Sequence, residues 1–218
     1  MSLLDTLERI GDLPAEVWLI PPVLILAAMA AIAWLRRSLQ LGRYRAVAER
    51  TGLTVVPKFF NPSEVRGSFR GRQLVMNETG RRRQALFRKR WTLVAVDVKN
   101  PESIRFNIWR QDGIDRFILA VGGTEIVIGD AEFDRRFVIR SRDDAALVIK
   151  AFGDHELRRM ILDANIEQMD LRDPHLFVYY GRVERDPEHG ERLFTAVTRL
   201  ADAVDALKAE YQPEIIRT

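Results

Sequence analysis

The sequence contains no cysteine among its 218 residues. Without cysteine the chain can form neither disulfide bonds nor thiolate metal sites, and it has no cysteine nucleophile. Only three histidines occur, His155, His175 and His189, and their spacing matches no zinc-binding motif. A phosphate-binding loop, a dinucleotide-binding glycine motif and a serine-hydrolase motif are also missing. We therefore expect no metal and no cofactor, and the sequence nominates no catalytic residue.

Charge is missing from one long stretch of the chain, residues 17–35. As a helix these 19 residues would extend about 28 Å, close to the thickness of a bilayer's hydrocarbon core. A buried helix of a soluble protein is rarely apolar on every face over this length. A cleaved signal peptide would begin with a positive segment, whereas four of the five charged residues before the run are acidic. We predict a single transmembrane helix over residues 16–36.

Aromatic and basic residues flank this helix in the way that membrane anchors require. Tryptophan favours the headgroup level, and arginine and lysine favour the cytoplasmic side of a membrane. The residues that we assign to the anchor are Trp18, Trp34, Arg36 and Arg37. Five arginines lie within 15 residues after the run, and one precedes it. We therefore expect the N-terminus outside the cell inner membrane and the C-terminal domain in the cytoplasm.

The positive charge of the chain is unevenly distributed. Residues 36–142 hold 23 basic and 11 acidic residues, whereas residues 143–218 hold 10 basic and 16 acidic residues. An anionic inner leaflet would attract the basic half near the anchor, by about 1 kcal/mol for each basic residue held at the surface. Only five of the 34 basic residues are lysine, which we interpret as the mark of a GC-rich bacterial genome.

Patterns of hydrophobicity divide the chain into five parts. Besides the transmembrane helix we expect a short amphipathic N-terminal segment, a basic juxtamembrane helix, a cytoplasmic α+β domain and a polar tail. In chain order these parts are residues 1–15, 16–36, 37–52, 53–211 and 212–218.

Alternating apolar residues and turn signals recur within residues 53–183, which predicts many short strands. The turns between them are too short for parallel crossovers, so the pairing should be antiparallel. The expected strands are residues 53–59, 65–69, 73–78, 91–98, 104–109, 117–121, 124–128, 137–140, 166–171 and 176–183.

Capping patterns and apolar periodicity predict the helices that follow. Ser141, with Asp144 three residues later, would open a helix that ends at Gly153, and Asp154 would cap a second short helix. Residues 193–207 repeat apolar side chains at helical spacing and should bury one face on the sheet. The predicted fold class is α+β, a transmembrane helix followed by a mostly antiparallel sheet packed by C-terminal helices.

Six basic residues crowd into residues 81–90, RRRQALFRKR, which we expect to be a loop between two strands. They are Arg81, Arg82, Arg83, Arg88, Lys89 and Arg90. Contact with anionic lipid headgroups is the favoured functional interpretation, and contact with nucleic-acid phosphates is a less favoured one. A third interpretation is a solvated hairpin tip whose charges only prevent edge-to-edge aggregation.

Three carboxylates alternate along the next stretch, Asp130, Glu132 and Asp134. In an extended chain alternate side chains share a face, so these three could meet a hard cation. The adjacent Arg135 and Arg136 favour ion pairs and turn capping over a metal site. We therefore expect these carboxylates to have a structural role.

The same stretch carries a pattern of the form G-D-x-x-F-D-x-x-F-x-[VI]. Its residues here are Gly129, Asp130, Phe133, Asp134, Phe137 and Ile139. The pattern resembles one found in an uncharacterised bacterial family of membrane-anchored proteins with a domain of unknown function. The resemblance implies a bacterial membrane-anchored domain and brings no catalytic residue with it.

These observations favour a single-pass, membrane-anchored binding or scaffold module without catalytic activity. Its expected partners are the membrane, through the anchor and the anionic inner leaflet, and a protein partner or a second copy of the chain. An alanine-rich face of the anchor would suit such self-association, and a plain lipid-facing helix fits the same stretch at least as well. The alternative is an enzyme that acts on a membrane-proximal substrate through the carboxylates near residues 130–134.

Overall fold

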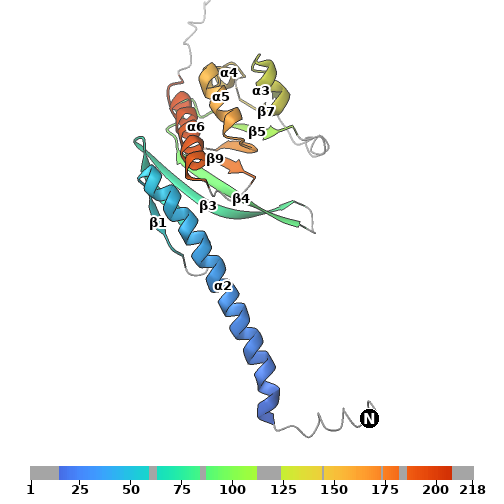
Figure 1. Cartoon of the computed structure of the whole chain (residues 1–218). Helices are drawn as coiled ribbons and strands as arrows, with labels where there is room; N and C mark the ends of the chain where they lie inside the picture. Colours follow the sequence, from blue (N-terminus) through green and yellow to red (C-terminus); the bar gives the residue numbers. More distant parts are fainter. Residues whose placement is uncertain are drawn as a thin grey trace, which may run out of the picture. The chain divides into compact units, whose positions relative to one another are not determined.

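A computed structural model of the chain describes residues 15–58, 63–83, 87–111, 124–143, 145–172, 174–181 and 186–207 (Figure 1). The chain divides into two compact units, Met1–Gly42 and Arg43–Thr218. The expected strand at residues 117–121 and the polar tail at residues 212–218 lie outside the described residues.

One long helix, α2, runs over Ala15–Thr51 and covers both the predicted transmembrane helix and most of the predicted juxtamembrane helix. Pro21 and Pro22 lie near its start. The helix ends at Gly52, as the sequence predicts, because that residue takes a φ of +71° that favours glycine. The Leu53 N–H then donates to the Ala48 carbonyl at 3.0 Å, which closes the last turn.

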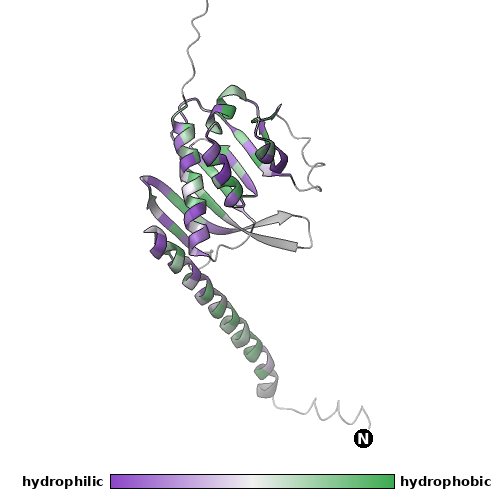
Figure 2. Cartoon of the chain, turned by 45° about the horizontal axis from the view of Figure 1, so that its top comes forward, coloured by the Kyte–Doolittle hydropathy of each residue, from purple (hydrophilic) through white to green (hydrophobic). Residues whose placement is uncertain are grey.

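The two parts of α2 differ in their surroundings. In the first unit, side chains from residue 20 to residue 35 are all exposed, and Figure 2 shows hydrophobic residues along most of this length. In the second unit, Tyr44, Val47 and Ala48 are buried in the core of the domain. The last turns of α2, from Arg43 onward, therefore belong to the folded domain, ten residues before the boundary expected at residue 53.

The described residues of the second unit form a nine-stranded sheet in which all neighbouring strands pair antiparallel, as predicted. The strand order is β1-β2-β3-β4-β9-β8-β5-β7-β6. The strands are β1 Thr54–Val56, β2 Glu64–Phe69, β3 Arg72–Arg83, β4 Phe87–Asp97, β5 Phe106–Arg110, β6 Thr124–Ile126, β7 Phe137–Ser141, β8 Gln168–Arg172 and β9 His175–Tyr180. Arg70 and Gly71 both take positive φ, which makes the expected tight turn between β2 and β3.

Four helices accompany the sheet in the described part of this unit: α3 Ala131–Arg136, α4 Ala145–Ala151, α5 His155–Asp163 and α6 Pro187–Asp205. Asp154 caps α5 as predicted, since its carboxylate accepts from the Glu156 N–H at 2.9 Å. We expected a helix to open at Ser141, but that residue ends β7. Its hydroxyl donates to the Arg105 carbonyl at 2.6 Å, so it secures the strand and α4 begins at Ala145.

The core lies between one face of the sheet and these helices. Register places Met76, Val94 and Val178 side by side on that face, and all three are fully buried. The amphipathic helix α6 buries its apolar side against them, including Leu193 and Leu200, as the periodicity predicts.

Ion pairs connect the last turn of α6 to the first residue of β3. The Arg72 guanidinium donates to Asp205 and to Asp202, each at 2.7 Å. The second carboxylate oxygen of Asp205 accepts from the backbone N–H groups of Lys99 and Asn100 at 2.7 and 3.1 Å. Asp205 is only 12% exposed, so one carboxylate satisfies three donors at a largely covered position.

Candidate functional site

The first candidate site is the exposed apolar part of α2. Nine large hydrophobic side chains between residues 20 and 35 are exposed by half or more, and Trp34 is exposed by 69%. Among the described residues, α2 is the one helix long and apolar enough to cross a membrane. The other assigned anchor residues, Trp18, Arg36 and Arg37, lie on the same helix.

The second candidate site, the six basic residues of the 81–90 segment, does not lie on a loop as we expected. Arg81, Arg82 and Arg83 belong to β3, and Arg88, Lys89 and Arg90 belong to β4. Strand propensity was underestimated here because charged residues are uncommon in strands, whereas the pairing continues the register set by the apolar residues before them. We call the strand pair formed by residues 78–83 and 87–91 the basic ribbon.

Among the described residues, the basic ribbon extends past the strands that pair with it on either side. The pairing of β2 with β3 stops at Asn77, and that of β9 with β4 starts at Thr92. Within the ribbon Arg81 is paired with Lys89, and Arg82 with Arg88. Like charges directly opposite each other destabilise a strand pair.

The three carboxylates near residue 130 do not converge. The structure replaces the extended chain that we assumed with the short helix α3, so alternate residues no longer share a face. Asp130 caps this helix through the Glu132 and Phe133 N–H groups, at 3.2 Å each. Asp134 accepts from the backbone N–H groups of Ile128 and Gly129 at 2.9 Å each. Among the described residues no group of three or more metal-ligating side chains forms.

Asp130 also joins α3 to α5. Its second carboxylate oxygen accepts from Arg158 Nε at 2.8 Å, and both side chains are largely covered. The hydrogen bond from Arg158, followed by that from the Phe133 N–H, lowers the pKa of Asp130 below its ordinary value. A carboxylate held ionised by such partners suits a structural role and disfavours a general acid.

The pattern G-D-x-x-F-D-x-x-F thus has a structural explanation. Gly129 takes a φ of +88°, which lets the chain turn before the helix. Its two aspartates cap the turn and the helix, and the rings of Phe133 and Phe137 lie 4.9 Å apart. The residues that carry the family resemblance therefore build the α3–β7 junction.

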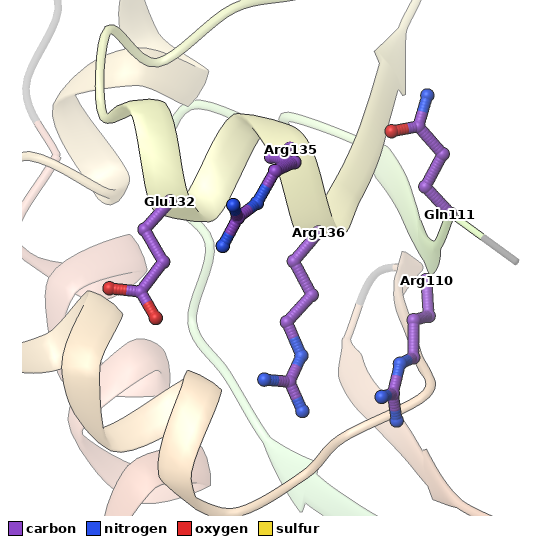
Figure 3. A pocket seen from close by; sticks show the side chains of 5 residues that line it. All are labelled: Arg110, Gln111, Glu132, Arg135 and Arg136. Atoms are coloured by element: carbon purple, nitrogen blue, oxygen red, sulfur yellow. The ribbon is translucent and has the colours of Figure 1, made fainter.

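A polar cleft lies beside this junction, and sequence reasoning did not find it. It has a volume of about 230 Å³ and is lined by Arg110, Gln111, Glu132, Arg135 and Arg136 (Figure 3). The first two come from the end of β5 and the residue after it, and the other three come from α3. Antiparallel pairing of β5 with β7, extended by the Gln111 N–H to the Arg136 carbonyl at 2.8 Å, brings them together.

Asn165 positions two of the three arginines. Its side-chain oxygen accepts from Arg110 Nη1 at 2.8 Å and from Arg136 Nη2 at 2.9 Å. Asn165 adopts a φ of +50°, a conformation that asparagine tolerates better than most residues. An amide oxygen is neutral, so these two contacts to Asn165 hold the guanidinium groups of Arg110 and Arg136 near each other and supply no negative charge of their own.

Comparisons with known proteins identify no family for this chain. No family model matches it. No curated protein matches it either. Among solved structures it is similar to the crystal structure of the mycobacterial trehalose monomycolate transport factor A, with a TM-score of 0.49 and 14% sequence identity. That match covers 77% of this chain and 97% of the other.

Proposed function

We propose that this protein is a single-pass membrane-anchored module without catalytic activity, whose domain faces the cytoplasm of a bacterial cell. In this proposal α2 carries the anchor, the basic ribbon contacts the anionic inner leaflet, and the domain serves as a binding or scaffold unit. We also propose kinship with the bacterial membrane-anchored proteins that the G-D-x-x-F-D-x-x-F pattern resembles.

The exposed apolar part of α2 is the observation that carries the proposal. Full burial of a large aliphatic or aromatic side chain is worth about 1.5–3 kcal/mol. The nine such side chains exposed between residues 20 and 35 therefore forgo on the order of 10 kcal/mol or more if they stay in water. This is comparable to the whole stability of a domain, which supports burial of these side chains in another apolar phase. A bilayer would cover a helix on all sides, which fits this exposure pattern.

Charge supports the orientation. Arginines at residues 36, 37, 43, 45 and 50 follow the apolar stretch, and one basic residue precedes it. The positive-inside rule then directs the domain to the cytoplasm. Reporter fusions at the C-terminus test this, with a fluorescent protein expected to be bright and alkaline phosphatase inactive. Active phosphatase would contradict the orientation.

Contact between the basic ribbon and lipid can be tested because the chain has no cysteine. A single cysteine replaces Thr79 in the ribbon, and a matched control replaces the exposed Ser68 on β2. Each is labelled with a fluorophore, and the full chain is reconstituted in vesicles that contain a quencher-labelled lipid. We expect stronger quenching at Thr79→Cys when anionic lipid is added, and little change at Ser68→Cys.

Replacing the six basic residues of the ribbon by glutamine should abolish the added quenching, since each contributes about 1 kcal/mol at an anionic surface. High salt should also weaken it. Equal quenching at Thr79→Cys in neutral and anionic vesicles would contradict the contact between the basic ribbon and anionic lipid. It would not bear on the membrane anchor.

A further inference from the structure

We propose that the polar cleft between β5 and α3 binds a phosphate-type oxyanion through Arg110, Arg135 and Arg136. The site is separate from the basic ribbon and does not depend on the proposed lipid contact there. Its ligand is a phosphate group, carried either by a small soluble phosphate ester or by a lipid headgroup.

The charge of the lining selects an anion. Three guanidinium groups and one carboxylate, that of Glu132, line the cleft together with the amide of Gln111. These five described residues together carry two net positive charges, which match a phosphate monoester at neutral pH better than a single carboxylate. Guanidinium groups offer paired N–H donors whose spacing fits the oxygens of such an anion.

The positions of the arginines are set before a ligand arrives. Asn165 holds Arg110 and Arg136 by one neutral oxygen, at 2.8 and 2.9 Å. The Nε atom of Arg136 is buried and has no hydrogen-bond partner among the residues that the structure describes. One neutral oxygen thus holds two cations in place, and one of these cations has an unused donor. Because the side chains are already ordered, less side-chain entropy is lost when an oxyanion binds, so the site is prepared for such a ligand.

The size and polarity of the cleft limit what it can recognise. A volume of about 230 Å³ is below the range typical of drug-sized ligands, and the described residues that line the cleft are all polar or charged. Figure 3 shows the side chains of Arg110 and Arg136 extending in the same direction, with Arg135 directly before Arg136 at the end of α3. The cleft therefore has room and partners for a phosphate group, and the remainder of the ligand would stay outside.

The test measures binding of inorganic phosphate to the full chain in uncharged detergent by isothermal titration calorimetry. The variant Arg135→Gln/Arg136→Gln should bind at least about tenfold more weakly, since charged hydrogen bonds are lost. The matched control Arg159→Gln/Arg192→Gln removes two exposed arginines of α5 and α6 and should bind like the native chain. Glu132→Gln removes the repelling carboxylate and should tighten binding about two- to fivefold.

These variants decide the proposal even if one of them fails to fold. Loss of phosphate binding in the first variant, or tighter binding in Glu132→Gln, supports the site. Absence of phosphate binding to the native chain, or equal binding by the native chain and Glu132→Gln, overturns it. The glutamine-substituted ribbon variant should still bind phosphate in this assay, which separates the cleft from the ribbon.

Competition identifies the source of the phosphate group. Glycerol 3-phosphate and a short-chain phosphatidic acid are each titrated against bound inorganic phosphate in the same detergent. Stronger displacement by phosphatidic acid assigns the cleft to lipid headgroups, and equal displacement assigns it to soluble esters. Displacement by neither compound overturns the assignment to phosphate esters.

Discussion

Arginine in place of Leu26 tests the membrane anchor directly. Leu26 lies at the middle of the uncharged run, and its side chain is 65% exposed. At the centre of an inserting helix leucine contributes about −0.5 kcal/mol and arginine about +3 kcal/mol. The substitution therefore costs roughly 3 kcal/mol of insertion free energy, on the order of a hundredfold in the ratio of inserted to free chain.

The control for this prediction is a second exposed aliphatic residue in the folded domain. Val127 follows β6 and is 64% exposed, close to the value for Leu26. Alkaline extraction of cell membranes measures how much of each variant stays in the bilayer. We expect Leu26→Arg to be depleted from the membrane fraction and Val127→Arg to be retained like the native chain. Equal retention of both variants would refute the assignment of α2 to the bilayer.

Three further predictions concern the domain, with urea unfolding in detergent as the measurement for each. Phe133→Ala should lower the free energy of unfolding by about 3–5 kcal/mol, because a fully buried ring is removed from an aromatic cluster; a loss under about 1 kcal/mol would contradict this packing. Asp205→Ala should lower the free energy of unfolding by about 2–4 kcal/mol, because three hydrogen-bond donors lose their acceptor. Asp202 is 65% exposed, so Asp202→Ala should lower it by less than about 1 kcal/mol. Similar losses in the two variants would contradict this prediction. Because Arg158 lowers the pKa of Asp130 in the folded state, that carboxylate stabilises the fold above its ordinary pKa, and the contribution is lost as the pH falls through the lowered value. The acid-induced loss of stability below about pH 5 should therefore be smaller in Asp130→Asn than in the native chain, and identical pH profiles would contradict it.

Long helices and strands with a regular spacing of apolar residues were predictable from the sequence, because that spacing shows which side of the element is buried. The helical spacing of apolar residues over 193–207 predicted α6, and Gly52 predicted the end of α2. The turn at Arg70 and Gly71 also followed from residue type. In each case a single local property, periodicity or a positive φ, determines the structure.

The short helix α3 was missed because its six residues are too few to show helical periodicity. Its stability comes from the caps supplied by Asp130 and Asp134, whose alternation fits an extended chain equally well in the sequence. The arginine cleft was missed for another reason. Arg110 and Arg136 are separated by 25 residues and meet only through strand register and the oxygen of Asn165, which sequence does not reveal.

The strand order has a consequence for synthesis on the ribosome. Strand β4 takes its partner from β9, with Thr92 opposite Tyr180, and β5 reaches β4 only through β8 and β9. At about 5–20 residues per second, the 83 residues that follow Asp97, up to and including Tyr180, need about 4–17 seconds to be made. During that interval β4 and β5 present open edges, where a newly made chain is most liable to pair with another copy. The late hairpin of β8 and β9 thus joins two half-sheets and covers the edges of β4 and β5.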